Sequence, residues 1–256
     1  MAQREPELSP ADFYNGVAVD FASDLNRLFY EKIAAHLLNL VPLEPVGSIP
    51  IKSILEVGAG CGFATRKIRE RFPKAKIVAL EPATSLLNLS KSKIPGVQWV
   101  GGRLADFRPA HRFDLVVSSM SYHWLSRGER ERFMRLAKSL ALAIPVTSTD
   151  SSATNQFLVK LMLSLKVRPK WVREVRQAGR VTSEVGKFSR EVIESDLSLR
   201  EHFATPQSLA KILYNRGVLL GLFGGQAERA KEILGQSSLS SETFFNWSIK
   251  CFVGTK

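Results

Sequence analysis

The residues with the clearest chemical potential form a glycine-rich segment that follows a predicted strand. Glu56 precedes Gly58, Gly60 and Gly62, and the segment comes directly after the apolar run SILEV at 53–57. Glycines at a strand-to-helix turn let backbone N–H groups and a ligand approach closely, because no Cβ intervenes. Glu81 follows the next predicted strand, where a carboxylate can accept both hydroxyls of a ribose. The pattern predicts a nucleoside-binding turn.

The spacing of the glycines narrows the type of cofactor. A dinucleotide fingerprint, G-x-G-x-x-G, would need glycine where Phe63 stands, whereas the spacing present here is G-x-G-x-G. That spacing fits a cofactor without a pyrophosphate. The alternative is a turn with a purely structural role. Cys61, inside this turn, is interpreted as a small filler and not as a nucleophile.

A second cluster follows the predicted strand FDLVVSS at 113–119 and reads Met120-Ser121-Tyr122-His123-Trp124. His123 could act as a base or as a hydrogen-bond donor to a substrate carboxylate, and Trp124 could form a pocket wall. The alternative is an aromatic pair that packs under the next helix. Tyr14 could reach the same pocket from the N-terminal segment or serve as a hydrophobic anchor. The four scattered histidines predict no metal cluster.

Strands and helices alternate through the first part of the chain, which predicts a parallel α/β sheet. An amphipathic helix is expected at 21–41. Strands are expected at 53–57, 76–80, 97–100, 113–119 and 140–146, and helices at 62–72, from about Pro82, and at 128–140. The last helix meets its strand without a loop, so either the helix ends early or a loop is missing.

The pattern changes after residue 147. Helices are expected at 155–165 and 170–178, the second ending at Gly179, and further helices at 205–217 and 226–235. Alternating residues predict a strand at 193–203, and another is expected near 244–253. We predict a single domain over 1–256, divided into an N-terminal helical segment (1–50), a cofactor-binding core (51–147), a helical lid insert over the carboxyl ends of the strands (148–182), and C-terminal elements that complete the sheet (183–256).

The segment EVGAGCG, Glu81, and FDLVVSSMSYHW resemble the class I S-adenosylmethionine-dependent methyltransferases. The resemblance covers 53–147 with specific motifs and is closest to the malonyl-carrier-protein O-methyltransferases of biotin synthesis and related small-acid enzymes. It implies a doubly wound, seven-stranded, mostly parallel α/β sheet of order 3-2-1-4-5-7-6, with the last strand antiparallel and a helical insert after strand five. It also implies S-adenosylmethionine as the cofactor.

The resemblance implies a role for each matching residue. Cofactor-binding residues would be Glu56, Gly58, Gly60, Gly62, Glu81, Leu104, Ser118 and Ser119, with Glu81 on the ribose and the serines at the methionine end. His123 would be the catalytic residue, and Tyr122, Trp124 and Tyr14 would contact the substrate. One position departs from the family, because Arg103 stands where relatives commonly carry an acidic residue near the adenine amino group. Backbone groups of Leu104, or Asp106, could substitute for it.

The charge of the chain bears on its partners. The net charge is +12, and residues 51–112 hold twelve Lys and Arg against four carboxylates. Such an excess attracts an acidic carrier protein, an anionic small molecule or a nucleic acid. The segment SSMSYHWL lacks the N-P-P-[FY] motif of many amino-methylating enzymes, and no RNA-binding module is visible, so a nucleic-acid partner is not favoured. We expect O-methylation of a small or carrier-bound carboxylate, with a nucleic-acid methyltransferase or a non-methylating accessory protein as alternatives.

Sequence features also bear on location. Two cysteines, Cys61 and Cys251, cannot form a disulfide framework, which favours a reducing cytoplasm. No apolar run approaches the roughly 20 residues that a membrane-spanning helix needs. The first residues, MAQREPELSP, are unlike a signal peptide. A cytoplasmic protein without a membrane partner is expected.

Overall fold

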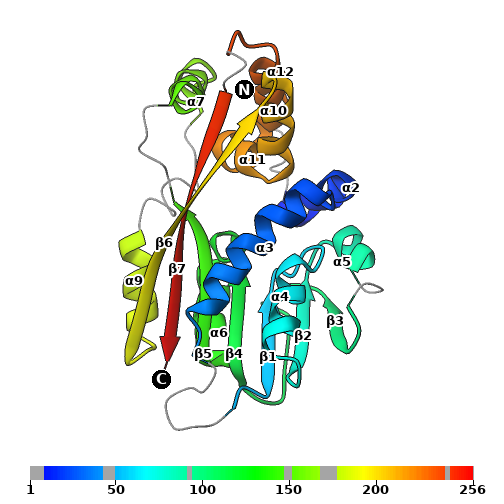
Figure 1. Ribbon diagram of the computed structural model, residues 1–256, viewed down its shortest axis with the longest axis vertical. Coiled ribbons are helices and arrows are strands. Elements are labelled where there is room, and N and C mark those ends of the chain that lie inside the picture. Colours follow the sequence, from blue (N-terminus) through cyan, green and yellow to red (C-terminus); the bar gives the residue numbers. More distant parts are fainter. Residues whose placement is uncertain are drawn as a thin grey trace, which may run out of the picture.

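A computed structural model describes residues 9–42, 50–90, 94–146, 152–167, 178–239 and 243–255. They form one seven-stranded sheet of order β3-β2-β1-β4-β5-β7-β6, in which β7 runs antiparallel to both of its neighbours (Figure 1). This confirms the doubly wound sheet that the sequence predicts. The strands are β1 (Ser53–Val57), β2 (Lys76–Glu81), β3 (Val97–Gly101), β4 (Phe113–Ser119), β5 (Ala137–Val146), β6 (Glu191–Phe203) and β7 (Thr243–Thr255).

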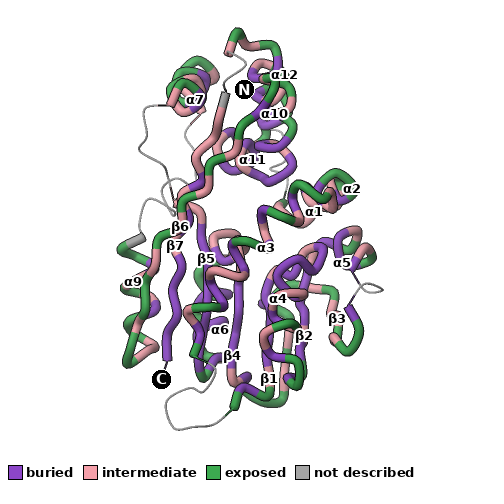
Figure 2. Tube along the Cα trace, viewed as in Figure 1, coloured by how far each residue is buried: buried purple, intermediate pink, exposed green. Residues whose placement is uncertain are grey.

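The central strands are buried on both faces, as near-continuous apolar runs in a parallel sheet require. In β1, Ile54 points into a core shared with α3 (Asp24–Asn39) and α4 (Phe63–Arg71). Leu55 and Val57 point to the other face, where α6 (Arg127–Leu136) and α9 (Ala178–Gly186) pack. Figure 2 shows these strands as a buried band between the two layers of helices. Because the side chains of each strand pack into these two cores, the position of the residue that follows each strand is fixed at the edge of the sheet.

The remaining helices lie around the ends of the sheet. No helix of the described residues is both long and apolar enough to cross a membrane. The additional elements are α1 (Pro10–Gly16), α2 (Ala18–Phe21), α5 (Thr84–Ser90), the 3₁₀ helix η1 (Tyr122–Trp124), α7 (Ala153–Ser164), α10 (Pro206–Asn215), α11 (Val218–Phe223), the 3₁₀ helix η2 (Gly224–Gln226) and α12 (Ala227–Gly235).

The junction between α6 and β5 is as short as the sequence suggests. The helix ends at Leu136, four residues earlier than expected, and Ala137 is already extended with φ −90° and ψ 139°. Ala137 pairs with Phe113 of β4 at the start of the parallel ladder. The chain therefore changes from helical hydrogen bonding at Leu136 to strand pairing with β4 at Ala137. Of the two alternatives that the sequence leaves open, the structure shows the early helix end.

The helix expected at 170–178 lies almost entirely outside the described residues, and the structure tests only the role of Gly179 as its stop. α9 begins at Ala178 and continues to Gly186, so Gly179 does not terminate it, and residues 170–177 lie outside the described residues. Val181 and Val185 stand one helical turn apart and pack against the sheet core around Phe252. This packing outweighs the helix-ending tendency of glycine. α11 is a further helix that the sequence pattern did not reveal.

Strands β6 and β7 form a long antiparallel ribbon of thirteen residues each, paired from Glu191 and Thr255 to Phe203 and Thr243. Figure 1 shows one end of this ribbon rising beyond the rest of the sheet, with α7, α10, α11 and α12 around it. α7 is tied to β7 by Thr154, whose Oγ1 donates a hydrogen bond to the carbonyl of Phe244 at 2.9 Å.

A buried guanidinium joins this ribbon to the N-terminal helices. The side chain of Arg216, just after α10, is 1% exposed and forms an ion pair with Glu201 of β6 through both of its terminal nitrogens. Its Nε donates to Asn26 Oδ1 in α3 at 2.7 Å. The charge lies 3.7 Å from the ring centre of Phe29 and 4.9 Å from that of Trp247. One side chain therefore contacts α3, β6 and β7.

We predict that Arg216→Ala lowers the free energy of unfolding by about 3–5 kcal/mol, because it leaves the carboxylate of Glu201 without its buried partner. The matched control is Arg200→Ala. Arg200 is an exposed arginine on the same strand as Glu201 and hydrogen-bonds Asn246 at 2.9 Å. Its loss should cost less than about 1 kcal/mol. Denaturant unfolding followed by circular dichroism measures both values, and equal losses would contradict the role of Arg216.

Candidate functional site

A cavity of about 220 Å³ opens at the carboxyl ends of β1 to β4, where doubly wound sheets bind ligands. Residues of the loops after all four strands line it. Of the sequence-predicted residues, the lining contains Glu56, Gly58, Gly60, Glu81, Leu104, Ser119, Trp124 and Tyr14. Gly62, Ser118, Tyr122 and His123 are not part of the lining. The structure therefore brings most of the predicted cofactor residues together, but only two of the three substrate candidates.

The glycine turn after β1 is held against its neighbours at close range. The N–H groups of Gly58 and Ala59 donate to the carbonyl of Leu80 in β2 at 2.9 and 3.1 Å. Gly58 has φ +75°, and a Cβ there would lie 2.3 Å from the hydroxyl oxygen of Ser121. Gly62, at φ +82°, would bring a Cβ within 2.9 Å of the Trp99 ring. Gly62 thus serves packing behind the turn, outside the cavity itself.

Glu81 presents a carboxylate that is fixed on both oxygens. Oε2 accepts a hydrogen bond from the N–H of Gly60, and Oε1 accepts one from the N–H of Ala83, each at 2.8 Å. Burial raises the pKa of Glu81, and the two N–H groups oppose that rise. Each oxygen keeps a further acceptor position, since a carboxylate has about four. The group is preorganised to accept two hydroxyl donors from a ligand in the cavity.

Glu56 lies deeper in the same cavity, at 1% exposure. Burial is the main cause that raises the pKa of Glu56, to about 8, and the nearby charge of Glu81 raises this pKa further. The hydroxyl of Thr65 donates a hydrogen bond to the Glu56 carboxyl group at 2.5 Å and opposes the rise. Ser119 Oγ is buried at the end of β4 and has no hydrogen-bond partner among the described residues. A cavity that holds a buried carboxyl group and an unpaired hydroxyl suits a ligand that brings cationic and polar groups.

The N-terminal helices form one wall of the cavity. Tyr14 of α1 donates from its hydroxyl to the carbonyl of Arg216 at 3.2 Å, and its ring lies 6.4 Å from that of Trp124. Asn15 Oδ1 accepts from the N–H of Ser85 at 2.9 Å, which joins α1 to α5. Phe21 of α2 also lines the cavity. The described parts of the expected insert, in α7 and the start of α9, are not among the lining residues. Residues 147–151 and 168–177 lie outside the described residues, so the lid at 148–182 stays a prediction.

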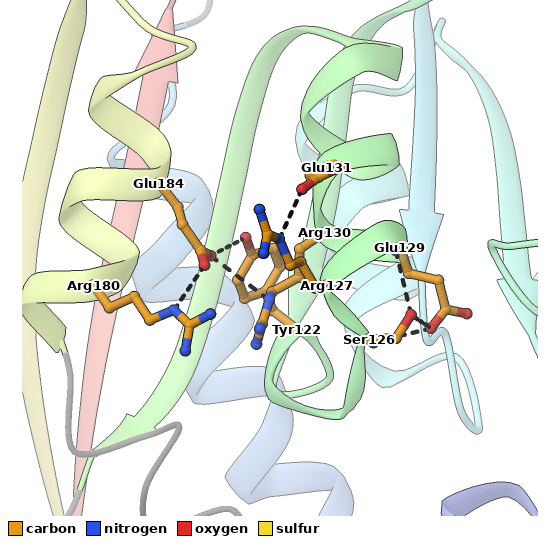
Figure 3. Close-up of polar contacts among 8 residues, drawn as sticks. All are labelled: Tyr122, Ser126, Arg127, Glu129, Arg130, Glu131, Arg180 and Glu184. Carbon is orange, nitrogen blue, oxygen red and sulfur yellow. Dashed lines mark hydrogen bonds and ion pairs between the residues drawn. The ribbon is translucent and has the colours of Figure 1, made fainter.

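Tyr122 points away from the cavity. In Figure 3 its hydroxyl meets Glu184 of α9 beside Arg130 and Arg180, and the hydrogen bond to Glu184 Oε2 is 3.0 Å long. Tyr122 is 1% exposed, and its ring lies 5.4 Å from that of Phe133. Its surroundings are those of the core between the sheet and α6.

His123 also lies outside the lining of the cavity. Its ring centre is 4.8 Å from that of Trp124, which does line it. Although part of the side chain remains accessible, desolvation lowers the pKa of His123 to about 3. The imidazole is therefore neutral at physiological pH. Its position supports Trp124 and does not place a base in the cavity.

The loop after β3 carries the position at which this chain departs from the family pattern. Gly102, Arg103 and Leu104 line the cavity, while Asp106 does not. Arg103 donates to Glu129 of α6 at 3.2 Å from Nε and 3.0 Å from Nη2. Glu129 also lines the cavity, and the sequence analysis did not single it out. The spacing of Ser126 and Glu129 is a capping-box signal for a helix start, but nothing in the sequence links it to Arg103.

Met120, directly after β4, is another lining residue that the sequence did not reveal. Its φ of +58° is unusual for a residue other than glycine. The N–H of Met120 donates to the carbonyl of Ala143 at 2.9 Å, which holds the turn against β5. Strained backbone of this kind concentrates at functional sites.

Comparison with known proteins gives this geometry a context. Residues 54–141 match the family model of a methyltransferase domain. Trans-aconitate 2-methyltransferase from Acidovorax sp. (strain JS42) is 28% identical over 114 residues, which cover 43% of this chain and 44% of that protein. Malonyl-[acyl-carrier protein] O-methyltransferase 1 from Ilyobacter polytropus is 27% identical over 99 residues, which cover 38% and 37%. The match thus spans less than half of either relative.

Solved structures share the fold over more of the chain. Phosphoethanolamine N-methyltransferase 2 from Haemonchus contortus, in complex with S-adenosylhomocysteine, superposes with a TM-score of 0.54 at 13% identity, covering 97% of this chain and 60% of that one. A putative methyltransferase from an antibiotic biosynthesis pathway of Anabaena variabilis gives 0.54 at 13% identity, covering 88% and 97%. Residues 54–141 therefore resemble a methyltransferase domain, and the described residues share the fold of these solved methyltransferases over most of the chain.

Proposed function

We propose that the protein transfers a methyl group from S-adenosylmethionine to a carboxylate of a small or carrier-bound acid. The observation that carries the proposal is the carboxylate of Glu81, fixed by two backbone N–H groups in the cavity beside the glycine turn. A purely structural turn would use only the hydrogen bonds from Gly60 and Ala83 and would leave the further acceptor positions of Glu81 in the cavity unused. When bound, the cofactor supplies a methyl group on a positively charged sulfur.

Residues at the ends of three strands would each bind a different part of the cofactor. Glu81 accepts from the ribose hydroxyls, with its oxygens already oriented by Gly60 and Ala83. Glu56 and Ser119 lie at the strand ends of β1 and β4, where a buried carboxyl group and an unpaired hydroxyl suit the amino-acid end. These groups would position the reactive centre near Met120 and Trp124, which also line the cavity.

Among the described residues around Trp124, we assign no side chain as a general base for the acceptor. Burial raises the pKa of the Tyr14 hydroxyl well above its usual value, so Tyr14 remains protonated, and His123 is neutral and lies outside the lining. A carboxylate acceptor is ionised at neutral pH, since its pKa is about 4, and needs no base. Catalysis would then consist of in-line placement of the carboxylate oxygen and exclusion of water by the aromatic wall.

The names of the relatives support the acid class of acceptor, because one acts on trans-aconitate and another on a malonyl-carrier protein. The net charge of +12 would attract an anionic small molecule or an acidic carrier protein. A methyltransferase test uses radiolabelled S-adenosylmethionine with trans-aconitate and with malonylated carrier protein as acceptors. Base-stable products would argue against methyl esters and hence against a carboxylate acceptor.

We predict that Glu81→Ala weakens binding of S-adenosylhomocysteine by about 10- to 100-fold, because a charged acceptor of the ribose is lost. Calorimetric titration measures the change. Glu70→Ala, an exposed glutamate of α4 that pairs with Lys67, is the control and should bind as the parent does. A ligand without the 2′-hydroxyl should lose affinity for the parent but not for Glu81→Ala. Equal affinity of Glu81→Ala and the parent for S-adenosylhomocysteine would refute the assignment.

A second prediction follows from the raised pKa of Glu56, about 8 in the free protein. The ammonium of the cofactor favours ionised Glu56, so binding below pH 8 must release a proton from it. Affinity for S-adenosylhomocysteine should therefore rise by up to about 10-fold per pH unit from pH 6 to 7.5 and level off above pH 8. In Glu56→Gln that rise should be absent. Parallel pH profiles of the two proteins, measured by titration calorimetry, would contradict a role for Glu56 in the binding of the ammonium.

The third prediction concerns the acceptor. With saturating cofactor, kcat/KM for a carboxylate acceptor should be flat from pH 6 to 9, because His123, with its pKa lowered to about 3, is neutral throughout. His123→Gln should reduce the rate by less than about 10-fold, since it loosens the support of Trp124 without removing a base. An acidic limb near pH 6–7 that disappears in His123→Gln would instead show that His123 acts as a base, the role that a phenol or alcohol acceptor would require.

A further inference from the structure

A second hollow of the molecule, a groove of about 480 Å³, lies between α6 and α9. The 3₁₀ helix η1 contributes to both hollows, since Tyr122 lines the groove and Trp124 lines the candidate cofactor cavity. Otherwise the two sets of lining residues come from different parts of the chain, and they have no member in common. Pockets of roughly 300–1,000 Å³ hold small molecules. The groove is therefore large enough to bind a ligand of its own.

The two helices each turn one face toward the groove. The lining residues lie three or four positions apart, at 127, 130, 131, 134 and 135 in α6 and at 180, 183, 184 and 187 in or directly after α9, which is the spacing of a single helical face. These faces present five cationic side chains, Arg127, Arg130 and Arg135 from one side and Arg180 and Lys187 from the other. Two carboxylates, those of Glu131 and Glu184, oppose them. The groove carries an excess of positive charge.

The carboxylates use only part of the hydrogen-bonding capacity of the arginines. Arg180 pairs with Glu184 through Nε at 3.2 Å, and Arg127 pairs with Glu131 through Nε at 3.1 Å. A guanidinium has five N–H donors, so the terminal amino groups of both arginines remain for another acceptor. The side chain of Lys187 has no hydrogen-bond or ion-pair partner among the described residues. Unused donors therefore lie on both sides of the groove.

Glu184 shows that the groove can hold an anionic group between the helices. Its Oε2 accepts from the hydroxyl of Tyr122 at 3.0 Å and lies 3.7 Å from Nε of Arg130, while Arg180 holds Oε1. Figure 3 shows Arg180 reaching from α9 toward Arg127 and Arg130 of α6, with Tyr122 and Glu184 between them. Donors from η1, α6 and α9 thus converge on one carboxylate, and further cations surround it.

We propose that this groove binds the phosphate groups of a small phosphorylated molecule. A phosphate group has three oxygens that can accept from both helices at once, and the planar forks of arginine match its geometry. Met134 and Phe188 line the same groove and provide apolar contact for the rest of the ligand. The site is separate from the candidate cofactor cavity, and the proposal does not depend on the acceptor of the methyl group.

The test is a calorimetric titration of the full chain with inorganic pyrophosphate at an ionic strength of about 0.15 M, which screens exposed charges beyond about 8 Å. The parent should bind pyrophosphate saturably. Arg180→Gln combined with Lys187→Gln should weaken that binding about 10-fold or more, because charge-assisted hydrogen bonds are lost. The control combines Lys211→Gln in α10 with Arg229→Gln in α12, which removes the same charge outside the groove and should bind as the parent does.

A single variant on the opposite side, Arg135→Gln, should weaken pyrophosphate binding about 3- to 10-fold, since the proposed site uses both helices. Every variant should keep the parental affinity for S-adenosylhomocysteine, and saturating S-adenosylhomocysteine should not displace pyrophosphate, because the two linings are distinct. Displacement, equal losses in the groove and control variants, or no saturable binding by the parent would overturn the proposal. Binding of a short single-stranded oligonucleotide but not of pyrophosphate would also overturn it, in favour of a nucleic-acid surface.

Discussion

The buried charge of Arg216 is the constraint on which the arrangement around the cavity depends. A guanidinium taken out of water must be fully paired, and here Glu201, Asn26 and the ring of Phe29 satisfy it. Its partners come from β6 and α3, so the long ribbon cannot shift relative to the N-terminal helices without exposing a charge to an apolar core. The carbonyl of the same residue accepts from Tyr14. The pairing of the buried Arg216 side chain therefore also fixes the carbonyl that holds Tyr14 in the wall of the cavity.

Three glutamates line the cavity, and their carboxyl groups have different hydrogen-bond partners. Glu81 is fixed by backbone N–H groups, Glu129 by an arginine and a helix cap, and Glu56 only by one threonine. The first two have partners that favour the ionised form, while burial of Glu56 favours the neutral one. A cationic ligand that is neutral at its base end matches this gradient. The described lining therefore offers hydrogen-bond acceptors that other residues hold in fixed positions.

Much of the fold could be predicted from the sequence, because its signals are local. The apolar strand 53–57, the glycine turn and Glu81 each follow from neighbouring residues, and they were found where they were expected. The pair of Arg103 and Glu129 could not be predicted, since its members are separated by 26 positions and meet only after two elements pack. The direction of the Tyr122 side chain likewise depends on α9, whose residues follow far later in the chain.

Two of the predicted residues, Tyr122 and His123, lie outside the cavity lining for one shared reason. His123 and Tyr122 stand directly after a strand at the functional edge, which makes them plausible ligands of a substrate. In a short 3₁₀ helix, however, consecutive side chains point in different directions, so only Trp124 of the three reaches the cavity. The helix-to-strand junction at Ala137 was visible as an anomaly in the sequence, but pairing with β4 decided where the helix ended.

The wall built by α1 and α2 has a kinetic consequence. Contacts to several other elements hold these short helices over the cavity, among them the hydrogen bonds from Tyr14 to the carbonyl of Arg216 and from Ser85 to Asn15. A ligand enclosed beneath them leaves only when such bonds open, so its residence time reflects the free energy of local opening and not its own contacts alone. We therefore expect the exchange rate of a ligand in this cavity to depend on local opening of the first helices more than on any movement of the sheet.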